Sequence, residues 1–110
     1  MTERTLIVAR MRPGSAAEVA ELFAASDGAE LPRALGVTRR DLYLYHDLYF
    51  HYVEFDGSAS DAMAGAGERE DFQRLCRDLD PHITPYDPKT WASPADARAK
   101  PFYHWTGEAR

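Results

Sequence analysis

LGVTRRDLYLYHDLYFHYVE, residues 35–54, sets the architecture that the rest of the chain must fit. Its residues are mostly aliphatic and aromatic, which favours extended strands. We predict a tight β-hairpin with strands at Val37–His46 and Leu48–Phe55 and a two-residue loop at Asp47-Leu48. Within this hairpin, Arg40 and His51 are the two polar residues of particular interest.

The loop also determines which side chains share a face, because side chains alternate along a strand. With this loop, Leu44 lies opposite His51. One face then carries Arg40, Leu42, Leu44, Tyr49, His51, Val53 and Phe55. The other face carries Arg39, Asp41, Tyr43, Tyr45, Phe50, Tyr52 and Glu54. The first face is typical of a core with two polar residues, and the second, rich in tyrosine, is typical of a subunit contact. A register slip of one residue would separate Arg40 from His51.

The segment before the hairpin predicts a strand and a helix. Thr5–Met11 is rich in β-branched residues and ends at a Pro-Gly turn. Ser15 and Glu18 have the spacing of a capping box, and an alanine-rich helix follows to about Ser26. The inner face of this helix carries Val19, Leu22, Phe23 and Ser26, with Asp27 at its edge and Gly28 as its C-terminal cap. We read Leu31-Pro32 as the start of a connection.

The segment after the hairpin predicts a second helix and a last strand. Residues 60–79 form a helical pattern that is interrupted near Gly65-Ala66-Gly67, with an inner stripe of Phe72, Leu75, Cys76 and Leu79. Asp80–Lys100 contains four prolines and is expected to be a lid or an interface arm. We predict a short aromatic strand at Phe102–Thr106.

The predicted order is β-α-β-β-α-β over a single domain, residues 1–110. This is the α+β, ferredoxin-like arrangement, an antiparallel four-stranded sheet with both helices on one face. The other face needs solvent or a partner. We therefore expect a homodimer of the dimeric α/β-barrel type.

Composition excludes several classes of function. The net charge of −5 argues against a nucleic-acid partner, and no run of basic residues indicates a membrane surface. Leu6–Ala9 is too short for a signal or membrane segment. The single cysteine, Cys76, predicts a reducing cytoplasm and is expected in the core. No histidine has metal-ligand spacing with another, and no nucleotide or flavin motif is present, so we expect neither a metal nor a cofactor.

Arg40, His51 and Asp27 are the candidate catalytic residues. A buried arginine needs an anion or polarised oxygens as a partner. Arg40 could form a structural ion pair with Asp27, or it could polarise a carbonyl or enolate oxygen in a pocket. His51 could be a hydrogen-bonded core histidine, or an acid or base near neutral pH. Trp91 and Trp105 are expected to serve packing or an interface, with pocket lining as the minority alternative.

The same residues also carry a family resemblance. The pattern comprises Asp27, Glu30-Leu31-Pro32, Leu35-Gly36-Val37, Arg39-Arg40, His46-Asp47-Leu48-Tyr49 and His51, and continues through Phe72-Gln73, Thr84-Pro85-Tyr86, Trp91, Phe102-Tyr103 and Trp105-Thr106. It resembles the tetracenomycin-type aromatic polyketide cyclase family over nearly the whole chain.

The resemblance implies a homodimer formed through the sheets and an enzyme that works without cofactors. Its substrate would be a poly-β-ketone or a partly cyclised intermediate from a type II polyketide synthase, free or bound to a carrier protein. The pocket would lie between helices and sheet, with Arg40, His51 and Asp27 as working residues. Substrate contacts are expected from Ser26, Phe23, Leu44 and Val53. The chain has Ser26 where the best-known type of the family has a histidine, so a mechanism with two histidines there does not fit.

This chemistry agrees with the residues themselves. His51 could remove a proton from a methylene between two carbonyls, and Arg40 could stabilise the enolate oxygen. Two alternatives remain: a cofactor-independent quinone-forming monooxygenase of similar fold, and a non-catalytic chaperone that holds the polyketide.

Overall fold

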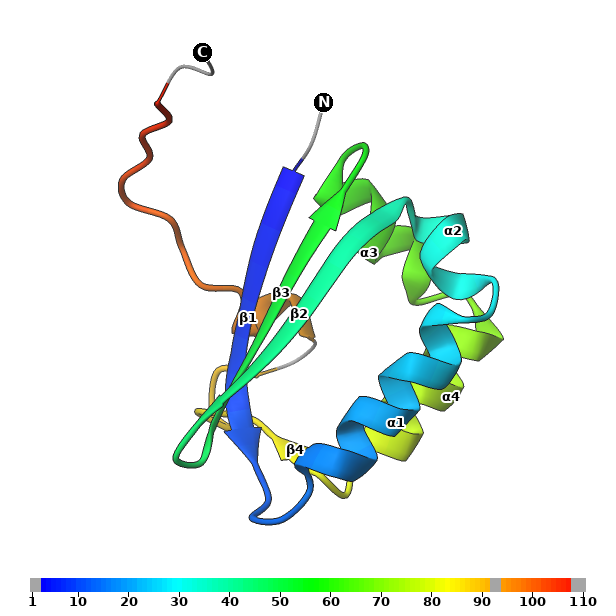
Figure 1. Ribbon diagram of the computed structural model, residues 1–110, viewed down its shortest axis with the longest axis vertical. Coiled ribbons are helices and arrows are strands. Elements are labelled where there is room, and N and C mark those ends of the chain that lie inside the picture. Colours follow the sequence, from blue (N-terminus) through cyan, green and yellow to red (C-terminus); the bar gives the residue numbers. More distant parts are fainter. Residues whose placement is uncertain (1–2, 92–93, 108–110) are drawn as a thin grey trace.

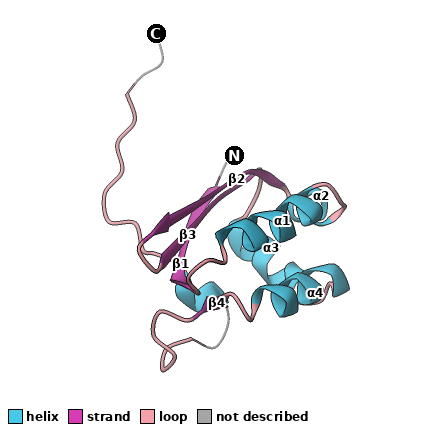
Figure 2. Cartoon of the chain, turned by 60° about the horizontal axis from the view of Figure 1, so that its bottom comes forward, coloured by secondary structure: helices cyan, strands magenta, loops and turns pink. Residues whose placement is uncertain are grey.

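The computed structural model describes residues 3–91 and 94–107. The elements follow as β1 (Glu3–Met11), α1 (Ala16–Asp27), α2 (Leu31–Leu35), β2 (Val37–Tyr45), β3 (Leu48–Phe55), α3 (Ala59–Ala66), α4 (Glu70–Leu79), β4 (Ile83–Thr84) and the 3-10 turn η1 (Pro94–Ala97). The strands form one antiparallel sheet in the order β2-β3-β1-β4. Helices α1 to α4 lie on one side of this sheet (Figures 1 and 2). This confirms the predicted ferredoxin-like arrangement.

The β2–β3 hairpin has the predicted faces but a different turn. The two-residue loop is His46-Asp47, not Asp47-Leu48, so Tyr45 pairs with Leu48 and Leu42 pairs with His51. His46 adopts a φ of 55°, the left-handed conformation that lets the chain reverse here. Moving the turn by one residue shifts each pairing partner by two, which keeps the faces. Arg40 and His51 therefore share the inner face, as predicted.

A bulge lies at the start of β2. The register shifts between Val37 and Arg39, where Val37 pairs with Phe55 and Arg39 with Glu54. The extra residue, Thr38, restores Val37 to the inner face, against a buried cluster that includes Val53 and Phe55. Strict alternation from Arg40 would have pointed Val37 outward.

Helix α1 begins as predicted, but its capping box is not formed. Ser15 makes no side-chain cap bond; its Oγ lies 2.8 Å from His82 Nδ1. Glu18 Oε2 lies 3.3 Å from His82 Nε2 instead of reaching back to Ser15. His82, which is distant in the sequence, contacts both Ser15 and Glu18, and these contacts replace the expected capping box. Val19 and Phe23 are buried, and Gly28 ends the helix as expected.

The predicted interruption near Gly65-Ala66-Gly67 is confirmed. It divides residues 60–79 into two helices, because the chain turns at Gly67 and the backbone at Arg69 is extended. Two other predicted segments need correction. The connection at Leu31-Pro32 is the short helix α2, where a proline in the first turn is favourable. Phe102–Thr106 is not a strand, because the edge of β1 is occupied by Ile83–Thr84 and by a bridge from Ile7 to Arg98.

The C-terminal residues leave the sheet after this bridge (Figure 1). Phe102, Tyr103 and Trp105 are exposed. The proline-rich arm Asp80–Lys100 contains β4 and η1, and residues 92–93 of that arm lie outside the described residues.

Candidate active site

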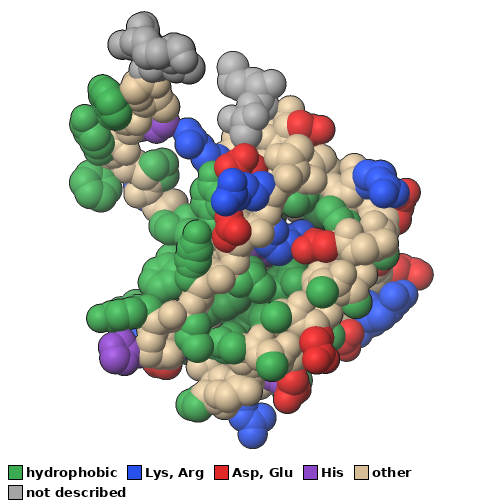
Figure 3. Space-filling model, in the orientation of Figure 1, with side chains coloured by type: hydrophobic (Ala, Val, Ile, Leu, Met, Phe, Trp, Pro, Cys, Tyr) green, Lys and Arg blue, Asp and Glu red, His purple; other side chains and the backbone are tan. Residues whose placement is uncertain are grey.

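A cavity of about 290 Å³ lies between the inner face of the sheet and the helices. Figure 3 shows hydrophobic side chains lining the hollow between the strands and the helices, with basic and acidic side chains beside it. The sheet contributes Ile7, Ala9, Val37, Arg40, Tyr49, His51, Val53, Phe55 and Ile83, and the helices contribute Phe23, Leu31, Leu35, Met63, Phe72, Leu75, Cys76 and Leu79. Asp80 and Trp91 complete the lining. The wall is therefore largely apolar, with few polar groups.

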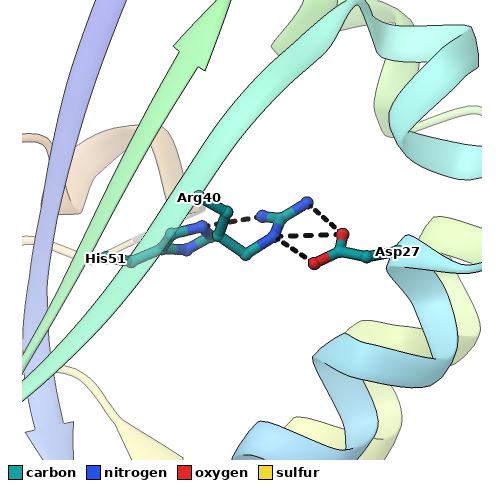
Figure 4. Close-up of polar contacts among 3 residues, drawn as sticks. All are labelled: Asp27, Arg40 and His51. Atoms are coloured by element: carbon teal, nitrogen blue, oxygen red, sulfur yellow. Dashed lines mark hydrogen bonds and ion pairs between the residues drawn. The ribbon is translucent and has the colours of Figure 1, made fainter.

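Arg40 and His51 line this cavity, and Asp27, which is not part of its wall, pairs with Arg40 (Figure 4). Arg40 Nε lies 3.1 and 3.0 Å from the two carboxylate oxygens of Asp27, and Arg40 Nη2 lies 2.8 Å from Asp27 Oδ1. On its other side, Arg40 Nη1 lies 2.8 Å from His51 Nε2. The Arg40 side chain is only 13% exposed, whereas that of Asp27 is 37% exposed. The predicted ion pair and the predicted pocket are thus both present.

The contact with Arg40 defines the protonation of His51. A guanidinium has five N–H donors and no acceptor, so Arg40 Nη1 donates and His51 Nε2 accepts. The neutral ring therefore carries its proton on Nδ1. Burial, and secondarily the positive charge of Arg40, lower the pKa of His51 from 6.5 to about 3. His51 is neutral near pH 7, and its Nε2 lone pair is already in use.

Phe23 of α1 packs against both polar residues. Its ring centroid lies 5.1 Å from that of His51, in an edge-on arrangement at 67°. Arg40 Cζ lies 4.9 Å from the centroid of the same ring. The aromatic ring therefore shields the Arg40–His51 contact from water and favours the cation through its π face.

The four predicted substrate contacts divide into two groups. Phe23 and Val53 line the cavity. Ser26 and Leu44 are not part of its wall. Leu44 lies next to the hairpin turn and is 51% exposed, because the helices do not extend over that end of the sheet.

Several wall residues carried no functional prediction. Leu75, Cys76 and Leu79 were expected in the core, since an inner helix stripe has the same pattern whether it packs tightly or borders a cavity. Trp91 lines the cavity, which was the less favoured of the two alternatives for this residue. Tyr49 lies on the predicted inner face of the hairpin, and this position was the one feature of the sequence that could have indicated its place in the cavity wall.

Across residues 3–91 and 94–107, no group of three or more His, Cys, Asp or Glu side chains is arranged to hold a metal ion. None of the described helices has the length and apolar character that crossing a membrane requires.

Comparison with known proteins places this geometry in context. A sequence model described as polyketide synthesis cyclase matches residues 3–106. The polyketide synthase CurG of Streptomyces cyaneus is 41% identical, over 91% of this chain and 94% of that protein. Tetracenomycin F2 cyclase of Streptomyces glaucescens is 39% identical over 96% of each chain.

Solved structures give the same result for the fold. The structure of tetracenomycin F2 cyclase from Streptomyces glaucescens, described as a type-II polyketide cyclase, aligns with a TM-score of 0.88 and 38% identity, over 96% of this chain and 99% of that one. A Chloroflexus aurantiacus protein assigned as an antibiotic biosynthesis monooxygenase aligns with a TM-score of 0.58 and 12% identity, over 79% of this chain and 86% of that one. At that identity the likeness concerns the fold alone.

Proposed function

Since the chain belongs to the polyketide synthesis cyclase family and is a polyketide cyclase, we propose that it directs an intramolecular aldol condensation and dehydration. The substrate would be a poly-β-ketone, or a partly cyclised intermediate, from a type II polyketide synthase. The names of the full-length relatives support this substrate class.

The observation that carries this proposal is the position of Arg40. Asp27 and His51 engage three of its five N–H donors, on Nε, Nη2 and Nη1. Two donors, one on each Nη, remain for a ligand, and Arg40 borders an apolar cavity. A fixed cation in such surroundings favours an oxygen on which negative charge develops. The substrate must therefore combine a large apolar surface with polarisable oxygens, as a polyketide does.

The reaction follows from the chemistry of the substrate and this cation. A methylene between two carbonyls is acidic, and transfer of its proton to a neighbouring carbonyl oxygen or to water gives an enol or enolate. Its carbon attacks a distant carbonyl of the same chain, a C–C bond forms, and the attacked oxygen becomes an alkoxide that takes up a proton. Loss of that hydroxyl with a neighbouring hydrogen releases one water and leads towards an aromatic ring. Arg40 donates hydrogen bonds to the oxygen that carries the negative charge.

In this mechanism, His51 and Asp27 are positioning residues that hold the guanidinium of Arg40 in one orientation. Asp27 accepts from one edge of the guanidinium, and His51 Nε2 accepts from Nη1. This differs from the expectation that His51 removes the substrate proton. With its Nε2 lone pair engaged and its pKa lowered to about 3, mainly by burial, His51 is a weak base at neutral pH.

Much of the rate enhancement would come from folding the chain correctly. A free poly-β-ketone has many methylenes and carbonyls that can react with each other. A cavity that fixes one pair in contact raises the effective concentration of that pair and excludes the others. We therefore expect variants of the wall to change the product pattern and variants of Arg40 to change the rate.

Product analysis tests the proposal. A minimal type II synthase that makes the poly-β-ketone would be assayed with and without this protein, and the products identified by mass spectrometry. One dehydrated aromatic product in place of a spontaneous mixture is the expected result. Because cyclisation with dehydration loses water, a product that gains oxygen would instead identify a monooxygenase. An unchanged mixture, with the free and the carrier-bound intermediate alike, would overturn the proposal.

Two variants of His51 separate the positioning role from a role as base. His51→Gln keeps an acceptor near the position of Nε2 and cannot act as a base, whereas His51→Ala removes the acceptor. We expect His51→Gln to retain most of the activity and His51→Ala to lose about tenfold or more. Equal losses in both variants would favour the base. Full activity of both His51→Ala and Arg40→Ala would favour a non-catalytic chaperone.

We also propose a homodimer in the cytoplasm. The outer face of the sheet exposes Tyr43 and Tyr45, and the C-terminal segment exposes Phe102, Tyr103 and Trp105. Aromatic side chains of this kind are enriched where proteins meet. Light scattering at micromolar concentration would give twice the mass of 12.4 kDa, and the mass of one chain would refute the dimer.

A further inference from the structure

Tyr49 is a polar residue of the cavity wall that the proposed mechanism does not use. It lies on β3, on the same face as His51 and Val53, and pairs with Ala9 of β1 and Leu44 of β2. The residue is 4% exposed, and its ring centroid lies 6.2 Å from that of His51. Tyr49, Arg40 and His51 therefore border one cavity.

The hydroxyl of Tyr49 has no hydrogen-bond partner within the described part of the chain. Buried phenols normally have one, because an unpaired hydroxyl away from water costs stability. Among the described residues, every fully buried polar side-chain atom has a hydrogen-bond partner. Since the Tyr49 oxygen has none, it is not fully buried. The hydroxyl therefore retains accessible surface in a residue that lines the cavity, which is where a bound molecule would meet it.

The charge state of Tyr49 makes it a donor. Burial raises the pKa of its hydroxyl above the ordinary value of 10.0, and the positive charge of Arg40 opposes this only in part. The group stays protonated at every pH at which the protein would work. A neutral phenol in an apolar wall can donate to a carbonyl, an enol or a phenol oxygen.

We propose that the Tyr49 hydroxyl binds a second oxygen of the polyketide and so determines which carbonyl reaches Arg40. The inference rests on the proposed function for the identity of the ligand. A poly-β-ketone carries oxygens at regular intervals, so one cation alone cannot distinguish them. Two donors at fixed positions in the wall select one register of the chain over the others. Tyr49 is then a residue that determines regiochemistry.

Tyr49→Phe removes this oxygen and keeps the ring. Tyr43→Phe is the matched control, because Tyr43 lies on the opposite face of the sheet and is 52% exposed. Binding of a dihydroxyanthraquinone, a stable aromatic with both carbonyl and phenol oxygens, would be followed through the fluorescence of Trp91 and Trp105. We expect Kd to rise about threefold to tenfold in Tyr49→Phe, which is the worth of one neutral hydrogen bond, and to stay unchanged in Tyr43→Phe. Equal affinity of wild type and Tyr49→Phe, or no binding by either, would overturn the inference.

Stability and product ratio give two further readouts. Because the hydroxyl has no partner among the described residues, Tyr49→Phe should leave Tm unchanged or raise it. A clear fall in Tm would indicate a structural hydroxyl and would overturn the inference.

In the reconstituted synthase, Tyr49→Phe should give a mixture of regioisomers where wild type gives one product. An unchanged ratio would refute the regiochemical role while the cyclase function stands. A wild type without cyclase activity would refute the proposed function, and the binding comparison would still decide whether Tyr49 contacts an oxygen.

Discussion

Acidification should destabilise the folded protein through His51. Its pKa in the folded protein is about 3, against 6.5 for an unperturbed histidine, chiefly because the ring is buried and secondarily because Arg40 lies beside it. Between these two pH values the unfolded chain binds a proton that the folded chain does not. The stability from His51 is therefore present above about pH 6.5 and is lost as pH falls towards 3.

The magnitude follows from the two pKa values. Between pH 7 and pH 5, the unfolded histidine changes from mostly neutral to almost fully protonated, while the folded one stays neutral. This linkage costs about 2 kcal/mol of unfolding free energy. For a chain of this size, that loss lowers Tm by about 10 °C.

The assay compares wild type with His51→Gln. Thermal and urea unfolding would be followed by circular dichroism at pH 7, 6 and 5 for both proteins. Carboxylates titrate in both, so the difference between the two pH dependences isolates His51. Glutamine keeps an acceptor for Arg40 Nη1 and has no titration of its own, so its curve should be the flatter one.

Parallel pH curves for the two proteins would refute the reasoning, because they would mean that His51 titrates normally in the folded state. Nitrogen-15 NMR provides an independent check. The proton should remain on Nδ1 between pH 7 and pH 5, with Nε2 as the acceptor from Arg40.

Three other substitutions test separate parts of the structure. Arg40→Lys keeps the charge but loses the planar fork, so kcat should fall by about 100-fold or more in initial-rate assays; a loss below threefold would show that charge alone suffices. Asp27→Asn should lower kcat/KM by about tenfold, because an amide offers one oxygen where the carboxylate offers two, and an unchanged value would argue against the positioning role. Gly36→Ala should cost about 2 kcal/mol in urea unfolding, mainly because φ is 75°, and the new Cβ would also displace the Asp56 carboxylate. Gly57→Ala, where a Cβ meets nothing within 4 Å, is its control, and similar costs for both would contradict this account.

The inner face of the hairpin was predictable because it depends on parity alone. An error of one residue in the turn shifts paired residues by two, so Arg40 and His51 remain on one side of the sheet. Asp27 was equally accessible to prediction, since its position one turn after Phe23 places it at the inner edge of a helix that ends beside β2.

Other features depend on contacts that sequence patterns do not contain. The contact between Arg40 and His51 depends on the tertiary structure, and the lowered pKa of His51 depends mainly on how deeply the ring is buried. The bulge at Thr38 has no glycine or proline to indicate it. Phe102–Thr106 is rich in aromatic residues, as many strands are, but a strand also needs a free edge to pair with. The edge of β1 is already paired with Ile83–Thr84 and bridged by Arg98.

Side-chain contacts hold helix α1 at both ends. At its start, Ser15 Oγ meets His82, in the segment after α4. At its end, Asp27 meets Arg40 of the sheet. The second contact includes Arg40, the cation proposed to act on the substrate, so the same ion pair holds the end of α1 and orients Arg40. A substitution at Asp27 should free the C-terminal end of α1 and also change the orientation of the Arg40 guanidinium. Crystal structures of Asp27 variants should show α1 displaced at its C-terminal end, while its first turn stays in place.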